Sequence, residues 1–423
     1  MLSTLRNAWK VPELRKRFLW TIFLVAIFRI GIHIPVPGID TSALSTLTES
    51  GGLLSFYNLI SGGAFTKASI LALSVSPYIN ASIIVQLLTI AIPSLEQLSK
   101  EGEEGRNKIQ SITRYLSIGI ACVLALGVYS TIASLGATNG IGTLERIVII
   151  FSLVVGSTFC MWLGDQITQK GFGNGVSILI FVNIVSQIPS TVSSVYTLKT
   201  AGEIDIIEIL LFLVGVIALL AVTLFFSLAE RRIPIQYAGK AVGSKVMRGQ
   251  STHIPLSIIG SAVIAIIFAM SVMMFPTTIA AFFPNKGWAQ AITSSKYSIF
   301  NSSTWMYPVC YAVLTVFFTW FYTQITFKPD EMAENLHKSA GFVPGIRPGE
   351  ATEKFFEKLL TKVSLIGGVY AAFLAVTPIL VSKYISGVQF GGTSLLILIG
   401  VALDFSRQLD SQLVMRHYNG FLK

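Results

Sequence analysis

The sequence predicts an all-α integral membrane protein with ten transmembrane helices. Hydrophobic residues make up 52% of its 423 residues and charged residues only 12%, about half the charged fraction of a soluble domain. Apolar stretches recur along the whole chain, and a helix needs roughly 20 apolar residues to cross a bilayer. The chain therefore has room for about ten crossings and little room for a soluble domain.

A hydropathy window of about 19 residues locates the expected crossings. They lie near residues 18–34, 70–92, 113–135, 147–165, 175–197, 206–228, 254–276, 303–327, 360–380 and 391–412. A basic stretch precedes the first crossing, as in a signal peptide, but no small-residue cleavage site follows it. We therefore expect a retained helix. Residues 53–65 are apolar, too short to span and bounded by glycines, which predicts a re-entrant half-helix.

Lysine and arginine are distributed unevenly over the connections. The N-terminus, the C-terminal tail and the alternate connections between them carry 22 of these residues, with five each in 229–253 and 328–358, whereas the other connections carry six. Positive charge collects on the cytoplasmic side of membrane proteins. We expect both termini and both long basic loops in the cytoplasm. The same excess explains the net charge of +10 more simply than nucleic-acid binding does.

Ten crossings divide into two halves of five. We expect an N-terminal half over residues 1–200, with crossings 1–5 and the half-helix near 53–68. The C-terminal half, residues 201–423, then has crossings 6–10 and both basic loops. An odd number of crossings per half means that a duplicated half would be inverted relative to the first. This architecture suggests a central pore between the halves.

The expected crossings contain few ionisable groups. Arg29, Arg114, Asp165 and the pair Asp404 and Arg407 lie toward segment ends, whereas ion-coupled transporters place such groups at mid-depth. The uncharged polar residues inside the spans are expected to form hydrogen bonds between helices. GFGNG at 171–175 is expected to be a tight turn, since glycine permits positive φ.

No catalytic or cofactor-binding pattern is evident. The sequence has no P-loop, zinc motif or nucleophile elbow in its spans, so we expect no catalytic residues, no metal and no cofactor. The leading hypothesis is that the protein conducts a substrate across the membrane and that the energy for this transport comes from outside the chain. A secondary transporter with an inverted repeat and an intramembrane protease or lipid-modifying enzyme are the alternatives.

Seven segments, spread over almost the whole chain, carry a resemblance to a known family. They are FRIGIHIPVPGID (28–40), SPYINASIIVQLL (76–88), KGFGNGVSILIF (170–181), ERRIPIQYAGK (230–240), STHIPL (251–256), GFVPGIRPGE (341–350) and GGTSLLI (391–397). In this order they resemble the SecY family, the channel subunit of the Sec protein translocase, in its bacterial and plastid form.

The resemblance implies a protein-conducting channel of the cytoplasmic (inner) membrane rather than an enzyme. Such a channel passes unfolded secretory polypeptides across the membrane and releases transmembrane segments sideways into lipid. The SecA ATPase or the ribosome supplies the work. Expected partners are SecE-like and SecG-like membrane subunits, signal peptides and nascent chains.

The resemblance also implies a ring of apolar side chains at the narrowest point of the pore. Its residues would be Ile79, Ile83, Ile180, Ile184, Ile267 and Ile397. Residues four apart share one face of a helix, which is consistent with this assignment, and an apolar constriction resists wetting. Without the resemblance, ordinary packing would be the simpler interpretation of each isoleucine.

Three further sites follow from the resemblance. The half-helix corresponds to a plug that closes the pore, with Phe56, Tyr57, Leu59, Ile60, Gly62 and Gly63. A lateral gate lies between crossings 2 and 3 on one side and 7 and 8 on the other, with Ser271 and Phe275. The basic loops would bind the SecA motor and the ribosome through Arg231, Arg232, Lys240, Lys245, Arg248 and Arg347.

Overall fold

The structure is a computed structural model. It describes residues 9, 11–39, 58, 61–134, 142–200, 202, 205–237, 241–242, 245–246, 251–260, 262–281, 286–295, 298–301, 304–384 and 392–420. The helices are α2 (Pro12–Gly31), α5 (Ser76–Ala91), α6 (Pro93–Lys100), α7 (Glu103–Ser134), α8 (Thr143–Lys170), α9 (Gly175–Thr200), α10 (Ile206–Leu228), α11 (Ala262–Ala281), α12 (Gly287–Ser294), α13 (Met306–Phe327), α14 (Pro329–Lys338), α15 (Glu350–Tyr384) and α16 (Gly392–Gly420). The strands are β1 (Glu230–Tyr237), β2 (Ala241–Val242), β3 (Lys245–Val246), β4 (Ser251–Ser257) and β5 (Gly341–Phe342).

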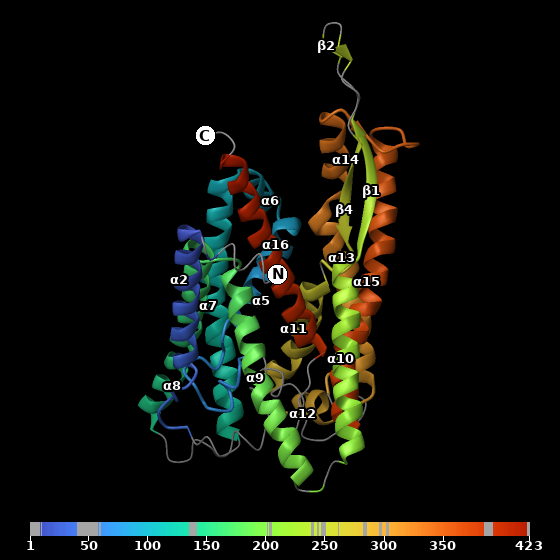
Figure 1. Ribbon diagram of the computed structural model, residues 1–423. Coiled ribbons are helices and arrows are strands. Elements are labelled where there is room, and N and C mark those ends of the chain that lie inside the picture. Colours follow the sequence, from blue (N-terminus) through green and yellow to red (C-terminus); the bar gives the residue numbers. More distant parts are fainter. Residues whose placement is uncertain are drawn as a thin grey trace.

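The helices form two groups that meet in the middle of the molecule. Figure 1 shows α2, α7 and α8 on one side, α10, α13 and α15 on the other, and α5, α9, α11 and α16 between them. In the first group α5 packs on α7, α7 on α8 and α8 on α9, while in the second α13 lies against both α11 and α15. Contacts of α9 with α16, and of α11 with α5 and α7, join the two groups.

Six described helices are long and apolar enough to cross a bilayer. They are α7, α8, α9, α10, α13 with its continuation α14, and α15. The pair α5 and α6, bent by 102°, would make a seventh if it is one broken span, and α11 has a shorter apolar stretch at residues 262–277. A helix lies at each of the ten expected crossings, but length and composition support six or seven of them. The count of ten stays a prediction.

Proline and glycine separate consecutive helices. Pro93 opens α6, where the missing N–H and the ring prevent α5 from continuing, and the axis bends there. Lys328 adopts a left-handed φ of 41° directly before Pro329, which ends α13 and starts α14. Gly173 has a φ of +82°. The tight turn predicted for residues 171–175 is therefore confirmed.

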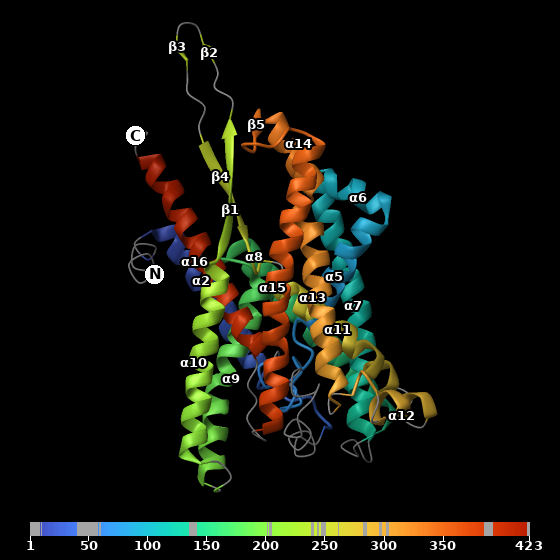
Figure 2. The same ribbon diagram turned by 90° about the vertical axis from the view of Figure 1, so that its right-hand side faces the viewer.

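A β ribbon replaces part of the loop expected at residues 229–253. Residues 230–236 of β1 pair antiparallel with β4, and Gln236 and Tyr237 pair with β5 on the other edge. Ile233 and Ile235 of β1 are buried against Leu336 of α14 and Phe356 of α15. The chain is thus mostly helical rather than all-α. Figure 2 shows the ribbon projecting from the end of the molecule where α6, α14 and the end of α16 also lie; we call this the basic end.

Two of the expected crossings begin later than predicted. The prediction of a crossing over 254–276 is wrong at its start, because residues 254–257 belong to β4 and pair with β1, and α11 begins at Ala262. Residues 61–75 form turns, and α5 begins only at Ser76. The backbone of this irregular segment pairs with the end of the first crossing, since Ile70 N donates to Ile34 O at 3.0 Å and Val36 N to Ala68 O at 2.8 Å.

Two adjacent glycines bring α15 close to its neighbours. A Cβ built on Gly367 would lie 2.2 Å from the carbonyl oxygen of Ile258, which precedes α11. A Cβ on Gly368 would lie 3.2 Å from the Cα of Val316 on α13. Backbone atoms cannot move aside as the end of a flexible side chain can. The tight contact of α15 with the rest of the second group therefore depends on glycine at both positions.

Gly367→Ala is expected to lower the free energy of unfolding by about 1–3 kcal/mol, the usual cost of overpacking an interior. Gly215→Ala on α10 is the matched control, because no heavy atom lies within 4 Å of its added Cβ. Helix propensity alone favours alanine at both sites by roughly 1 kcal/mol. Thermal unfolding of the purified proteins, followed by circular dichroism, measures the difference. Equal melting temperatures for the two variants would contradict the packing argument.

Candidate pore and side seam

Five of the six predicted ring isoleucines lie in one apolar cluster, which we call the central cluster. Ile79 comes from α5, Ile180 and Ile184 from α9, Ile267 from α11 and Ile397 from α16. Ile180, Ile184 and Ile397 are 5–6% exposed, and the other two are partly buried. These four helices occupy the middle of the molecule (Figure 1). The cluster therefore lies where the two helix groups meet.

Ile83, the sixth predicted ring residue, lies outside the central cluster. It is 6% exposed and lines a small cavity with Ile264 and Phe268 of α11 and Phe318 of α13. Ile79 and Ile83 are one turn apart on the same face of α5. Within that turn, α5 passes from the central cluster to its contact with α11 and α13.

The segment that follows the first crossing rests on polar side chains of α9. Gln187 Nε2 donates to the carbonyl oxygen of Asn58 at 3.3 Å, and Asn183 Nδ2 donates to Ser74 Oγ at 3.3 Å. These two side chains, which were expected to form hydrogen bonds between helices, thus bind Asn58 and Ser74 instead. Of the predicted plug residues, Phe56, Tyr57, Leu59 and Ile60 lie outside the described residues.

Gly62 and Gly63 are held close to these polar groups. Their φ angles are +68° and +84°, in the left-handed region that favours glycine. A Cβ on Gly62 would lie 2.5 Å from Asn183 Oδ1 and 3.1 Å from Nη1 of Arg29, and one on Gly63 would lie 3.1 Å from Gln187 Nε2. An added Cβ at Gly62 or Gly63 would therefore push the polar side chain of Asn183 or Gln187 aside, in addition to straining the backbone.

Arg29 takes part in the same polar region rather than serving only as an end anchor of the first crossing. Its Nη1 donates to Ser186 Oγ on α9 at 2.8 Å, and the guanidinium lies beside Gly62. Ser186 lies between Asn183 and Gln187 along α9. Together, Arg29, Asn183, Ser186 and Gln187 form a polar seat for Asn58 and residues 61–75, and we use that name below.

A second contact zone, the side seam, lies between α5 and the pair α11 and α13. Ser271 Oγ of α11 donates to Asn80 Oδ1 of α5 at 2.8 Å. Tyr322 Oη of α13 donates to Gln86 Oε1 of α5 at 2.8 Å. The apolar contacts of Ile83 lie between these two hydrogen bonds along α5. Two polar contacts and the apolar patch between them therefore hold the seam closed.

Opposite charges extend the side seam at the basic end. On α6, Lys100 Nζ donates to Glu96 at 2.7 Å, which lowers the pKa of Glu96, and the charge of Lys328 before α14 lowers it further.

The predicted gate residue Phe275 is 65% exposed on α11. The structure thus brings Ser271 into the seam and leaves Phe275 on the surface.

The described docking candidates are exposed at the basic end. Arg231 and Arg232 stand at the start of β1. Arg347 lies between Gly345 and Gly349, which both have positive φ, and its carbonyl oxygen accepts a hydrogen bond from a threonine of α15 at 2.8 Å. Lys240 and Arg248 lie outside the described residues, and only the backbone of Lys245, in β3, is described.

An apolar groove of about 430 Å³ runs between α2, α9 and α16. Its lining includes Phe18, Ile22, Phe172, Phe181, Val401 and Phe405. The rings of Phe172 and Phe405 lie 4.8 Å apart at an edge-to-face angle, which is a favourable aromatic geometry. The groove therefore offers a preformed apolar surface at a junction of both helix groups.

A family model for SecY matches residues 69–406. The curated Protein translocase subunit SecY of Rickettsia typhi is 40% identical over 419 residues, which cover 97% of this chain and 96% of the relative. The protein of the same name from Escherichia coli K12 is 40% identical over 419 residues, covering 97% and 94%. The chain belongs to the SecY family. The resemblance carried by its seven motifs is confirmed.

Solved SecY-type structures share the fold. "The structure of a protein conducting channel" has a TM-score of 0.66 to this chain at 18% identity, with 97% of each chain covered. The Sec61 channel in a canine ribosome-channel complex has a TM-score of 0.61 at 18% identity, again with 97% of each chain covered. At this level of identity the likeness concerns the fold.

Two contacts of this SecY-family chain escape sequence reasoning. Gln86 is conspicuous inside an apolar span. Its partner Tyr322 lies 236 residues away, and in the sequence Tyr322 is indistinguishable from other aromatic residues of a membrane helix. Arg29 is equally conspicuous, and its partner Ser186 lies 157 residues away. A lone polar residue in a span signals that a partner exists, because an unpaired polar group is costly there. It does not indicate which residue the partner is.

Gly62→Ala is expected to loosen residues 61–75, because the added methyl group would displace Asn183 from the polar seat. Gly102→Ala is the matched control, since Gly102 has a φ of +79° but no heavy atom within 4 Å of its added Cβ. Both variants carry the cost of a left-handed alanine, about 1–2 kcal/mol. Hydrogen–deuterium exchange should accelerate at 61–75 only in Gly62→Ala. Unchanged exchange there would disprove the role of the seat.

Proposed function

We propose that this chain is a protein-conducting channel that passes unfolded secretory polypeptides across a cell membrane and releases transmembrane segments sideways into lipid. The central cluster carries this proposal, because isoleucines from four helices of both groups meet in it. An apolar constriction resists water and ions and makes no sequence-specific demand on a polypeptide. Relatives named as translocase subunits and a fold neighbour described as a protein conducting channel support it.

We also propose the finer architecture. Ten crossings form two inverted halves, residues 1–200 and 201–423, around a pore that passes through the central cluster. The excess of lysine and arginine at the basic end supports a cytoplasmic position for that end and for both termini. By analogy with the bacterial relatives, the membrane is the cytoplasmic (inner) membrane.

Residues 53–68 act as the plug of the closed channel. In the described part of this segment, Asn58 accepts a hydrogen bond from Gln187 of the polar seat, Gly62 lies beside Asn183, and Ala64 belongs to the central cluster, which supports this role. A solved relative carries the description that its plug domain stabilizes the closed state and maintains a membrane seal. Displacing this segment breaks the Gln187–Asn58 hydrogen bond, worth about 1 kcal/mol, and the backbone hydrogen bond from Val36 to Ala68, and it removes Ala64 from the central cluster.

The side seam is the lateral gate. Separating α5 from α11 and α13 breaks the Ser271–Asn80 and Tyr322–Gln86 hydrogen bonds and opens the apolar contact of Ile83. Hydrogen bonds between membrane helices contribute roughly 0.6 kcal/mol on average. A bound apolar segment can offset that cost by packing into the open seam, whereas a polar segment cannot.

Partners occupy the surfaces that the chain leaves open. The apolar groove between α2, α9 and α16 fits a single transmembrane helix of a SecE-like subunit, and a SecG-like subunit is a second small partner. The ribbon and Arg347 dock the SecA motor and the ribosome; fold neighbours include channels in complex with ribosomes. These partners supply the work, and the channel itself catalyses no covalent step.

Crosslinking a stalled nascent chain tests the proposal. Photoreactive probes at Ile79, Ile180 and Ile267 should all react with a secretory chain held in the pore. A probe at Ser271 should react when the chain carries a signal peptide. A probe at Ile217 of α10, which is 59% exposed, is the control. Reaction at Ile217 equal to that at the three ring positions would contradict a central polypeptide path.

Arg347→Glu is expected to reduce SecA-driven translocation by at least about tenfold, since a reversed charge at a docking surface disfavours the partner by several kcal/mol. Arg106→Glu makes the same charge change at another exposed arginine of the basic end and should leave transport near the wild-type rate. Uptake of a preprotein into vesicles reconstituted with SecA measures both. Normal uptake by Arg347→Glu would remove Arg347 from the docking site.

A further inference from the structure

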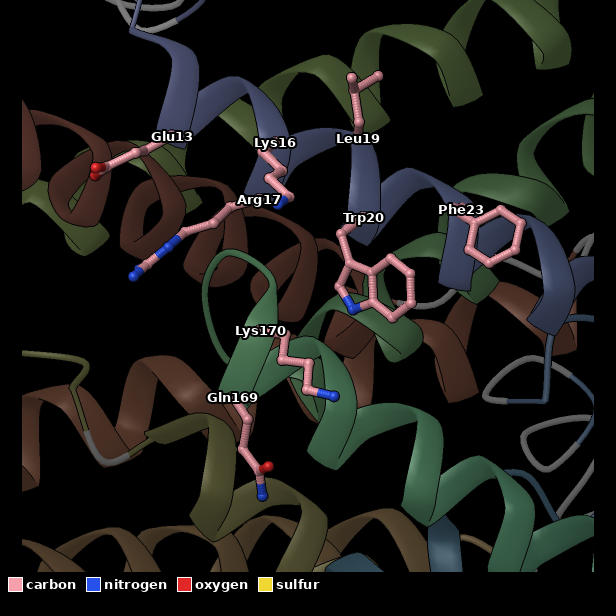
Figure 3. A pocket seen from close by; sticks show the side chains of 8 residues that line it. All are labelled: Glu13, Lys16, Arg17, Leu19, Trp20, Phe23, Gln169 and Lys170. Atoms are coloured by element: carbon pink, nitrogen blue, oxygen red, sulfur yellow. The ribbon is translucent and has the colours of Figure 1, made fainter.

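An open pocket of about 840 Å³ lies between the start of α2 and the end of α8. Figure 3 shows Lys16, Arg17 and Trp20 of α2 on the side that faces Gln169 and Lys170 of α8. The pocket occupies the face of α2 opposite to the apolar groove, because Lys16 and Trp20 are about half a helical turn from Phe18 and Ile22. It is therefore separate from the proposed SecE-like site.

Positive charge predominates in this pocket. Lys16, Arg17 and Lys170 line it together with one carboxylate, that of Glu13, which points away from Lys170 in Figure 3. Among the ion pairs between described residues, none includes Lys16, Arg17 or Lys170. Elsewhere at the basic end, lysines such as Lys100 and Lys354 are paired with a glutamate one turn away. The three pocket cations are thus available to an anionic ligand.

The pocket lies at the boundary between polar and apolar surface. Thr21 Oγ1 accepts a hydrogen bond from Phe172 N at 3.0 Å, which sets the end of α8 level with the middle of α2. Lys16 and Arg17 lie in the first two turns of α2, and Lys170 is the last residue of α8. Trp20 and Phe23 pack together with ring centroids 5.7 Å apart and are 37% and 54% exposed. Tryptophan prefers the interface between headgroups and acyl chains.

We propose that this pocket binds the phosphate headgroup of an anionic phospholipid. Lys16, Arg17 and Lys170 neutralise the phosphate from two helices, and the exposed rings of Trp20 and Phe23 contact the upper part of the acyl chains. A lipid fits better than a soluble phosphate, because the aromatic surface continues directly from the cationic one and a soluble anion would leave it uncovered. The site ties α2 and α8 together at the basic end.

Native mass spectrometry tests the site on the full chain, purified with any subunits that accompany it, in micelles of equal phosphatidylglycerol and phosphatidylcholine. The variant Lys16→Gln/Arg17→Gln/Lys170→Gln should retain at least about tenfold less phosphatidylglycerol, since a basic residue near an anionic headgroup contributes roughly fivefold in affinity. Phosphatidylcholine retention should not change. If this variant does not fold, Lys170→Gln alone carries the test, with an expected loss of about fivefold.

The matched control, Lys108→Gln/Lys338→Gln/Lys354→Gln, removes three exposed, ion-paired lysines and hence the same net charge. It should keep its phosphatidylglycerol within about twofold, because ion-paired exposed lysines attract a lipid only weakly. An equal loss in the control, or full retention in the pocket variant, would overturn the site. Displacement of the lipid by equimolar glycerol 3-phosphate would show a soluble-phosphate site and overturn the choice of a lipid.

Discussion

The bilayer imposes the constraint on which this structure depends, because polar groups in hydrocarbon must find partners within the protein. Helices satisfy this constraint because their backbone N–H and C=O groups form hydrogen bonds with each other. Residues 61–75 are not helical, and they meet it through the end of the first crossing and through α9. Ser69 Oγ donates to the Gly31 carbonyl at 3.0 Å, and Asn183 Nδ2 donates to Ser74 Oγ at 3.3 Å. The end of the first crossing and the polar seat thus together provide partners for this irregular backbone.

Apolar contacts and hydrogen bonds have different physical properties in this protein. The central cluster is non-directional, so isoleucine side chains can part and meet again without a specific geometry. Hydrogen bonds such as Ser271–Asn80 and Arg29–Ser186 are directional and exist only when the helices are in register. In the proposed channel the cluster provides the seal, and the hydrogen bonds specify the closed arrangement. Because these hydrogen bonds are few, the proposed opening can break them at a small cost in free energy.

One helix, α2, takes part in three environments. Phe28, which is fully buried, belongs to the central cluster, Ile22 faces the apolar groove, and Lys16 and Trp20 face the pocket beside α8. In the proposed assembly these faces contact the pore, a partner helix and a lipid headgroup. A substitution on any of these faces therefore affects a helix that also packs in the central cluster.

The sequence by itself determined that the protein resides in a membrane, where most helices lie and which end carries the basic residues, and its motifs determined the family. These features depend on apolar runs, on proline and glycine positions and on charge counts, all of which are properties of short stretches of the chain. Alternation around Ile233 and Ile235 could also have predicted β1. Only the tertiary structure decided that Ile83 leaves the central cluster, that Tyr322 pairs with Gln86 and that Arg29 reaches α9. These contacts join residues far apart in the chain, and their formation depends on how helices cross and rotate against one another, which no local pattern specifies.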